Sequence, residues 1–194
     1  MASILAAARV YATRFINRLL RKQWSFIVVG ASGFGKTGLI EVLTKDDPNM
    51  TYFATTEPQY HDIPGENYSV TEIPGSTCLS PGISRILLSK FDLIICVFHE
   101  TKPETIDYYR TLWKGSPPAP VVFVGNNVPG ARYDPRLEPH RKFLGYQKRI
   151  MLQGGIICPY FPVSYQSKTS CKELLRFLSL GSWPIHEELE HVEE

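Results

Sequence analysis

The sequence lacks long apolar runs, paired cysteines and, over its first forty residues, any acidic side chain. None of its apolar stretches approaches the roughly 18–20 residues that a membrane-spanning helix needs. Its four cysteines include no C-x-x-C pair, and the apolar runs around Cys96 and Cys158 favour buried free thiols in a reducing compartment. The formal net charge is only +2, which excludes a strongly basic nucleic-acid-binding protein, so no nucleic-acid partner is expected.

What remains is the composition of an ordinary globular protein. The chain has 194 residues, of which 43% are hydrophobic and 21% charged. This length suits one domain of roughly 100–200 residues with its own core. The charges are unevenly distributed, because basic residues are concentrated near the N-terminus and acidic residues near the C-terminus. We therefore expect a basic amphipathic helix in residues 1–23, one globular domain in 24–182 and an acidic tail in 183–194.

The first segment, residues 3–22, is predicted to form one amphipathic helix. Leu5 and Phe15 belong to its apolar face, and Arg14 and Arg18 lie opposite. Three interpretations stay open: peripheral contact with an anionic membrane, a mitochondrial targeting segment, or packing on the domain or on a partner. We expect an intracellular, cytoplasmic protein that is peripherally membrane-associated, with the mitochondrion as the alternative location.

Apolar runs rich in valine and isoleucine alternate with helical patterns along the globular domain. Such continuous strands with helices between them predict an α/β fold in three layers, a mostly parallel sheet with helices on both faces. We expect strands at 24–29, 68–73, 91–98, 121–124 and 156–163, and helices at 37–43, 105–113, 136–152 and 170–180.

The strongest motif is Gly30-Ala31-Ser32-Gly33-Phe34-Gly35-Lys36-Thr37, which has the pattern G-x-x-x-x-G-K-[ST] between an apolar strand and a helical run. Glycines let successive backbone N–H groups point at phosphate oxygens, and the helix that follows adds its dipole. Lys36 is placed to reach the β- and γ-phosphates of a nucleotide, and the Thr37 hydroxyl to bind Mg²⁺. The predicted nucleotide-binding set runs on to Gly38. The alternative is a glycine-rich turn that binds nothing.

Three further motifs follow this glycine-rich motif along the chain. Glu72-Ile73-Pro74-Gly75 begins 35 residues after Thr37, Gly125-Asn126-Asn127-Val128-Pro129 ends a buried strand, and Phe161-Pro162-Val163-Ser164 ends the last strand. In this order the chain resembles a Ras-like P-loop small GTPase domain over roughly residues 25–180. The three motifs stand where that family has Asp-x-x-Gly, Asn-Lys-x-Asp and a third base-contacting loop.

Within that superfamily the middle of the chain is most similar to the immunity-related GTPases. The similarity lies in Thr55-Thr56, Pro58, Tyr60-His61, Pro64 and Phe91-Asp92. An Arf-like organisation is the second choice, because those proteins also place an amphipathic helix before the phosphate loop.

The resemblance implies a Mg²⁺ ion with GTP or GDP. Thr55 or Thr56 would supply a hydroxyl that closes on the metal beside Thr37, and Glu72 would hold the same ion. The N–H of Gly75 would sense the γ-phosphate. Asn126 and Asn127 would lie at the base, together with Ser164 or, in another register, Ser167-Lys168.

Three departures from the family pattern weaken parts of this site. Glu72 replaces an aspartate, Ser76 stands where a water-orienting glutamine is expected, and Pro129 replaces the aspartate that pairs with guanine. Asp134 is an alternative acceptor for the base. These changes predict slow or absent hydrolysis and a weak preference for guanine, so no catalytic residue is assigned.

The expected function is a GTP- or GDP-binding switch protein that docks on a membrane or a partner through its N-terminal helix. One alternative is a pseudo-GTPase, a structural or assembly subunit without turnover, and another is a P-loop ATPase or kinase. A protein effector or assembly partner is expected in either of the first two cases. His61-Asp62 and His99-Glu100 are expected on loops, without a metal.

Overall fold

The described part of the chain contains one β-sheet. The computed structural model describes residues 23–44, 55–76, 81–99, 105, 108–109, 112, 117–126, 160–165 and 168–180. Several predicted features lie outside these residues, namely the helices at 3–22 and 136–152, the acidic tail, Asn127, Pro129 and Asp134.

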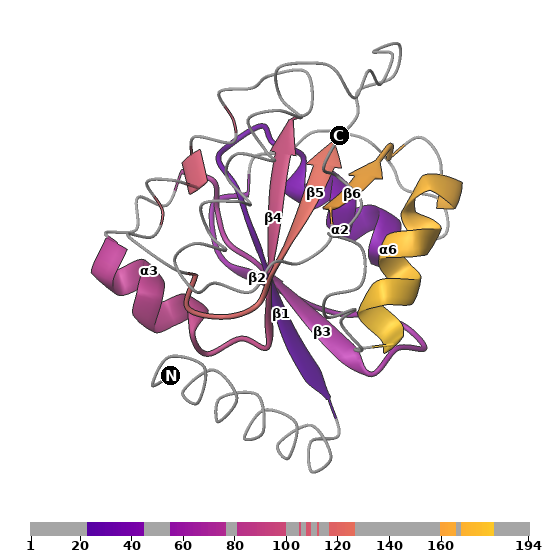
Figure 1. Cartoon of the computed structure of the whole chain (residues 1–194), viewed down its shortest axis with the longest axis horizontal. Coiled ribbons are helices and arrows are strands. Elements are labelled where there is room, and N and C mark those ends of the chain that lie inside the picture. Colours follow the sequence, from indigo (N-terminus) through magenta and orange to yellow (C-terminus); the bar gives the residue numbers. More distant parts are fainter. Residues whose placement is uncertain are drawn as a thin grey trace, which may run out of the picture.

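Six strands form this sheet in the order β2-β3-β1-β4-β5-β6 (Figure 1). β2 is antiparallel to β3, and each of the other neighbouring pairs is parallel. The mostly parallel sheet predicted from the sequence is thus confirmed. The strands are β1 (Trp24–Val29), β2 (Gln59–Asp62), β3 (Tyr68–Glu72), β4 (Leu93–His99), β5 (Val121–Asn126) and β6 (Tyr160–Val163).

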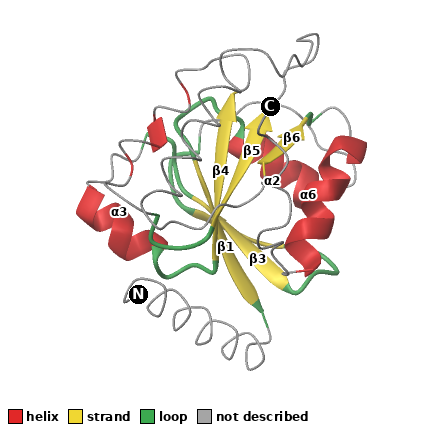
Figure 2. Cartoon of the chain, in the orientation of Figure 1, coloured by secondary structure: helices red, strands yellow, loops and turns green. Residues whose placement is uncertain are grey.

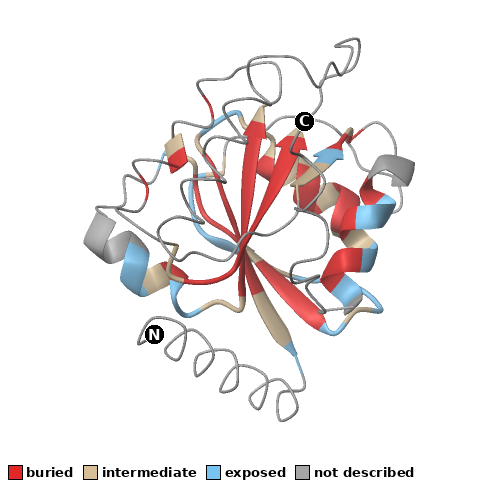
Figure 3. Cartoon of the chain, viewed as in Figure 1, coloured by how far each residue is buried: buried red, intermediate tan, exposed pale blue. Residues whose placement is uncertain are grey.

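Helices pack on both faces of the sheet (Figure 2). α2 (Lys36–Thr44) and α6 (Lys168–Leu180) share one apolar cluster with alternate residues of the strands. α3 (Pro81–Leu88) contributes Leu88 to the other cluster, on the opposite face. Because side chains alternate along a strand, β1 sends Val28 to the first cluster and Val29 to the second. Burial is greatest along the central strands (Figure 3).

The carboxyl end of β1 is the place where the chain changes direction across the sheet. From β1 the chain passes through α2 to β2 and β3 on one side, and from β3 through α3 to β4 on the other. Ligands of open α/β sheets bind outside the carboxyl ends of the strands at such a switch point. The glycine-rich turn that follows Val29 lies at this position.

Most predicted elements within the described residues are confirmed to within a few residues, but two elements escaped prediction. β2 is polar and largely exposed, so it carries no apolar pattern, and α3 is short. The loop assignment of His61, Asp62 and His99 was wrong, because the first two lie in β2 and the third ends β4. Cys96 and Cys171 are buried and form no disulfide with each other. None of the helices in the described part of the chain has the length and apolar character needed to cross a membrane.

Candidate functional site

The turn between β1 and α2, residues 30–37, forms a tight loop, here called the phosphate loop. The Phe34 N–H donates to the Ala31 carbonyl at 3.3 Å, and the Leu39 N–H donates to the Gly35 carbonyl at 3.0 Å as α2 begins. Gly33 and Gly35 have φ angles of 79° and 93°, in the left-handed region that glycine adopts readily. The first N–H groups of a helix have no acceptor within it, so the start of α2 is suited to an anion.

Lys36 holds its charge inside this loop. Its side chain is 5% exposed, and Nζ donates to the Ala31 carbonyl at 3.1 Å. Burial lowers the pKa of Lys36, and the attraction of Glu72 opposes that effect. The ammonium group therefore lies under the loop with a weakened hold on its proton, which a bound anion would strengthen.

Three oxygen-bearing side chains meet beside Lys36. The Thr37 hydroxyl donates to Oε1 of Glu72 at 2.8 Å, the Thr55 hydroxyl donates to the same atom at 3.1 Å, and the two hydroxyls are 3.1 Å apart. Glu72 is 1% exposed, and its Oε2 has no hydrogen-bond partner among the described residues. A buried carboxylate oxygen without a partner is unfavourable, so this group is suited to a cation.

The direction of the strands explains why these residues meet. β3 lies beside β1 with Glu72 opposite Val28, near the start of the phosphate loop. β2 runs the other way with Gln59 opposite Glu72, so the chain that leads into β2 passes this end of the sheet. Of the two threonines predicted there, Thr55 is half-buried and reaches Glu72, whereas Thr56 is exposed.

The donor set fits Mg²⁺ bound together with phosphate rather than a metal held by protein alone. No group of three or more His, Cys, Asp or Glu side chains is placed to bind a metal within the described ranges. Two hydroxyls and one carboxylate are hard oxygen donors, and Mg²⁺ is usually held by one or two carboxylates with waters and substrate phosphates. Thr37, Thr55 and Glu72 meet that description.

Gly75 lies directly against the phosphate loop. A Cβ atom placed on Gly75 would be 2.3 Å from the Ser32 nitrogen and 2.6 Å from the Ala31 carbonyl carbon. Only glycine allows two backbones to approach so closely without displacement. The segment after β3 and the phosphate loop are therefore in contact, and Ser76, the next residue, is exposed.

The ends of β5 and β6 reach the other side of the loop. The Asn126 Nδ2 group donates to the Phe34 carbonyl at 3.4 Å. Ser164 is half-buried, and the Tyr165 side chain that follows it is 6% exposed and lies against Gly35 and Gly38. The sequence reasoning missed Tyr165; its position next to Ser164 was the available signal.

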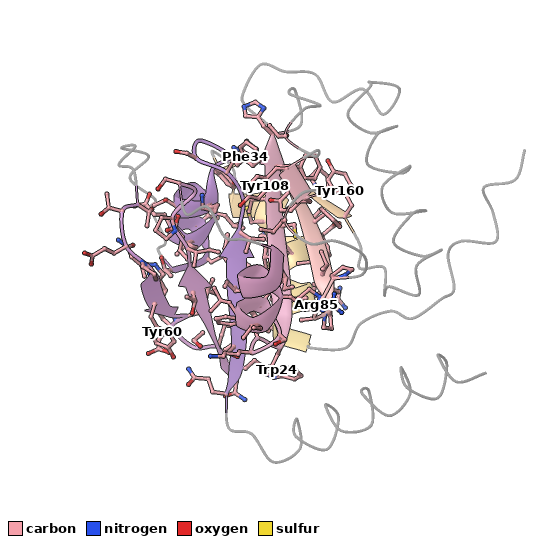
Figure 4. The ribbon with its side chains drawn as sticks, turned by 90° about the vertical axis from the view of Figure 1, so that its left-hand side faces the viewer. Trp24, Phe34, Tyr60, Arg85, Tyr108 and Tyr160 are labelled. Carbon is pink, nitrogen blue, oxygen red and sulfur yellow. The ribbon has the colours of Figure 1, made fainter. Side chains whose placement is uncertain are left out.

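Two further tyrosines, also missed, support the loop from behind. The Tyr109 hydroxyl lies 2.9 Å from the Val29 carbonyl oxygen and also contacts that of Val97, so it joins the ends of β1 and β4. The Tyr108 and Phe34 rings meet edge to face with centroids 5.9 Å apart, and Figure 4 shows them beside each other. No motif in the sequence marks these contacts.

Asp92, part of the resemblance to the immunity-related GTPases, lies away from this site. Its Oδ2 accepts from the Ser25 N–H at 3.0 Å and from the Ser25 hydroxyl at 3.2 Å. Ser25 lies at the beginning of β1 and Asp92 directly precedes β4, so both lie at the amino ends of the strands, opposite the end that carries the phosphate loop. Asp92 therefore links two strands and does not contribute to the loop.

Neither a family model nor a curated protein sequence matches this chain.

Proposed function

We propose that the chain is a nucleotide-binding switch protein built as a P-loop small GTPase domain, which takes Mg²⁺ with GTP or GDP. In this proposal the backbone of the phosphate loop and the Lys36 ammonium group bind the phosphates. Thr37, Thr55 and Glu72 hold the metal, which would neutralise phosphate charge. The mostly parallel sheet and the position of the loop at the end of β1 support this architecture.

The observation that carries the proposal is the meeting of Thr37, Thr55 and Glu72. These residues come from three separate segments, yet they share hydrogen bonds at 2.8–3.1 Å next to the buried Lys36. The unpartnered Oε2 of Glu72 among the described residues adds a reason for a cation. A glycine-rich turn without a ligand would have no need for a buried lysine and a buried glutamate at its base.

The contact between Gly75 and Ser32 supplies a means of sensing the third phosphate. A phosphate that entered between these residues would separate the two backbones and accept a hydrogen bond from the Gly75 N–H. Thr55 would close on the metal at the same time. The segments around Thr55 and Gly75 would then present a different surface to an effector, while Ser76 makes hydrolysis slow.

Binding of nucleotide by the purified full chain tests the proposal. We expect mass spectrometry to identify a co-purified nucleotide, and calorimetry to detect binding of GTP and GDP that depends on Mg²⁺. Lys36→Ala should abolish binding because it removes the cation at the loop. Lys90→Ala is the matched control, since Lys90 is exposed in the turn that leads to β4, at the end of the strands opposite the phosphate loop.

Equal binding by Lys36→Ala and by the unaltered chain would contradict the proposal, as would no binding of GTP, GDP or ATP by the unaltered chain. Steady hydrolysis of ATP or transfer of its γ-phosphate, without turnover of GTP, would keep the phosphate site and favour the ATPase or kinase alternative.

An assembly subunit without turnover is the second candidate. The exposed Ser76, in place of a water-orienting glutamine, favours it. A chain that retains bound GTP without releasing phosphate over hours would support this function, and steady GTP hydrolysis that Lys36→Ala removes would exclude it. Docking of residues 3–22 on a membrane or partner is part of both candidates and rests on the sequence.

A further inference from the structure

Tyr165 packs on the beginning of α2 in a space that two glycines leave open. A Cβ atom on Gly38 would lie 2.9 Å from Cδ2 of Tyr165, and one on Gly35 would lie 2.8 Å from its Cε2. The ring therefore occupies the volume that side chains at positions 35 and 38 would otherwise take. Its own side chain is 6% exposed, so it is enclosed there.

The order of the sheet indicates which part of a ligand this volume would receive. The inference rests on the proposed function, in which the terminal phosphates lie toward Thr55 and Glu72, at the ends of β2 and β3. β1 separates those strands from β4, β5 and β6. The rest of a nucleotide must therefore leave the loop toward β5 and β6, where Asn126 and Tyr165 lie.

The Tyr165 hydroxyl is not fixed in this position by a hydrogen bond to any residue that the structure describes. Its nearest surroundings include Gly35, whose Cβ position would be 3.1 Å from the hydroxyl oxygen. Burial raises the pKa of Tyr165, so the group stays a neutral donor. An unpaired buried hydroxyl is unfavourable, so apolar packing with residues of α2 and α6 offsets that cost and holds the ring against the loop.

We propose that Tyr165 is a specificity-determining residue that closes the nucleoside side of the phosphate loop. With the ring against Gly35 and Gly38, the loop binds a chain of phosphates, and the attached nucleoside adds little because its space is filled. The site would then take inorganic tripolyphosphate about as well as GTP. The sequence has Pro129 where an aspartate would pair with guanine, which would lower selectivity for the base further.

Calorimetry on the full chain with Mg²⁺ compares GTP with inorganic tripolyphosphate. For the unaltered chain we expect dissociation constants within about threefold of each other. Tyr165→Leu keeps an apolar side chain between α2 and α6 but removes the ring. We expect it to tighten GTP binding by about tenfold relative to tripolyphosphate. Tyr165→Phe, which keeps the ring, should leave the ratio unchanged.

Tyr160→Leu is the matched control. Tyr160 is the first residue of β6, but it packs on the opposite face of the sheet, against Phe98. GTP binding at least about tenfold tighter than tripolyphosphate in the unaltered chain would overturn the inference and leave the proposed function intact. An unchanged ratio in a folded Tyr165→Leu variant would also overturn it. Failure of both ligands to bind the unaltered chain would overturn the proposed function itself.

Discussion

Lys36 and Glu72 are the charged side chains that the described part of the chain buries most completely, at 5% and 1% exposure. Burying a charge costs free energy, and both residues carry that cost at the same end of the sheet. Neither is needed to complete the apolar core, which is formed by the strands and helices around them. Their burial is therefore what the anion and the cation of the proposed function would require, and packing alone does not require it.

The lowered pKa of Lys36 predicts proton uptake on polyphosphate binding. Between that lowered value and the ordinary 10.5, the free folded chain holds the amine partly neutral, and a bound anion restores the ammonium form. Calorimetry at alkaline pH in buffers of different ionisation enthalpy measures this uptake. Lys36→Arg, which stays charged, should bind without it.

The lowered pKa of Lys36 also makes the free energy of unfolding depend on pH. The unfolded chain binds more protons than the folded chain between the lowered pKa and 10.5, so the Lys36 contribution to the unfolding free energy rises with pH across that window. Denaturant unfolding at a series of alkaline pH values measures this change. In the binding experiment above, equal proton uptake by the Lys36→Arg variant and the unaltered chain would show that the proton does not bind to Lys36.

Glu72→Gln is predicted to weaken Mg²⁺-dependent nucleotide binding by about 10–100-fold, the usual effect of losing a supporting oxygen at a metal site. The amide keeps an oxygen that can accept from Thr37 and Thr55, so the local fold should persist. Titration of GTP with and without Mg²⁺ measures the effect. A variant that retains the full Mg²⁺ dependence would show that the carboxylate does not serve the metal.

At the level of helices and strands, apolar pattern decided what the sequence could predict. β1, β4 and β5 are continuous buried runs and were found, whereas β2 reads Gln-Tyr-His-Asp and is mostly exposed, so nothing in its pattern marks a strand. α3 was missed although Pro81 stands at its first position, a place where proline is favoured.

For the candidate site, the sequence could predict contacts between neighbouring residues better than contacts between distant segments. The phosphate loop could be predicted from the spacing of residues 30–37, because these residues are consecutive in the sequence. The meeting of Thr55 with Glu72 could be expected only through a family resemblance, since it depends on how β2 pairs with β3. Tyr109 and Tyr165 reach the loop from distant segments through packing, for which the sequence holds no local pattern.

Gly38→Ala tests the packing of α2 on the end of β6. Alanine is favoured over glycine in a helix by roughly 0.5–1 kcal/mol, yet here its Cβ would lie 2.9 Å from the Tyr165 ring. We expect a net destabilisation of about 1–2 kcal/mol by denaturant unfolding, because overpacking outweighs helix propensity. In a Tyr165→Ala background the same substitution should stabilise the chain. Additive effects of the two substitutions would contradict this contact.

For the molecule as a whole, the candidate site and the N-terminal segment belong to different regions of the chain. The described residues of the candidate site lie between positions 30 and 165, so on the proposed function binding of polyphosphate should not require residues 3–22. The sequence of that segment predicts a separate role in docking on a membrane or a partner. The two activities can therefore be tested independently.

Removal of residues 1–22 is predicted to release the chain from vesicles that contain anionic lipid, because it removes five basic residues and the apolar face of the predicted helix. Co-sedimentation with sucrose-loaded vesicles measures this, and neutral vesicles are the control. The shortened chain should still bind GTP. Absence of the intact chain from the anionic vesicle pellet would exclude membrane docking.

The antiparallel direction of β2 links the edge of the sheet to the oxygens that we propose bind the metal. Thr55 precedes Gln59 by only four residues, and Gln59 is paired with Glu72. A slip of β2 along β3 would move Thr55 by about 3.4 Å per residue, more than the hydrogen bond to Glu72 tolerates. On the proposed function, a partner that bound the exposed Tyr60 on this strand would therefore also change the affinity for the cation, and the cation would change the affinity for that partner by the same factor.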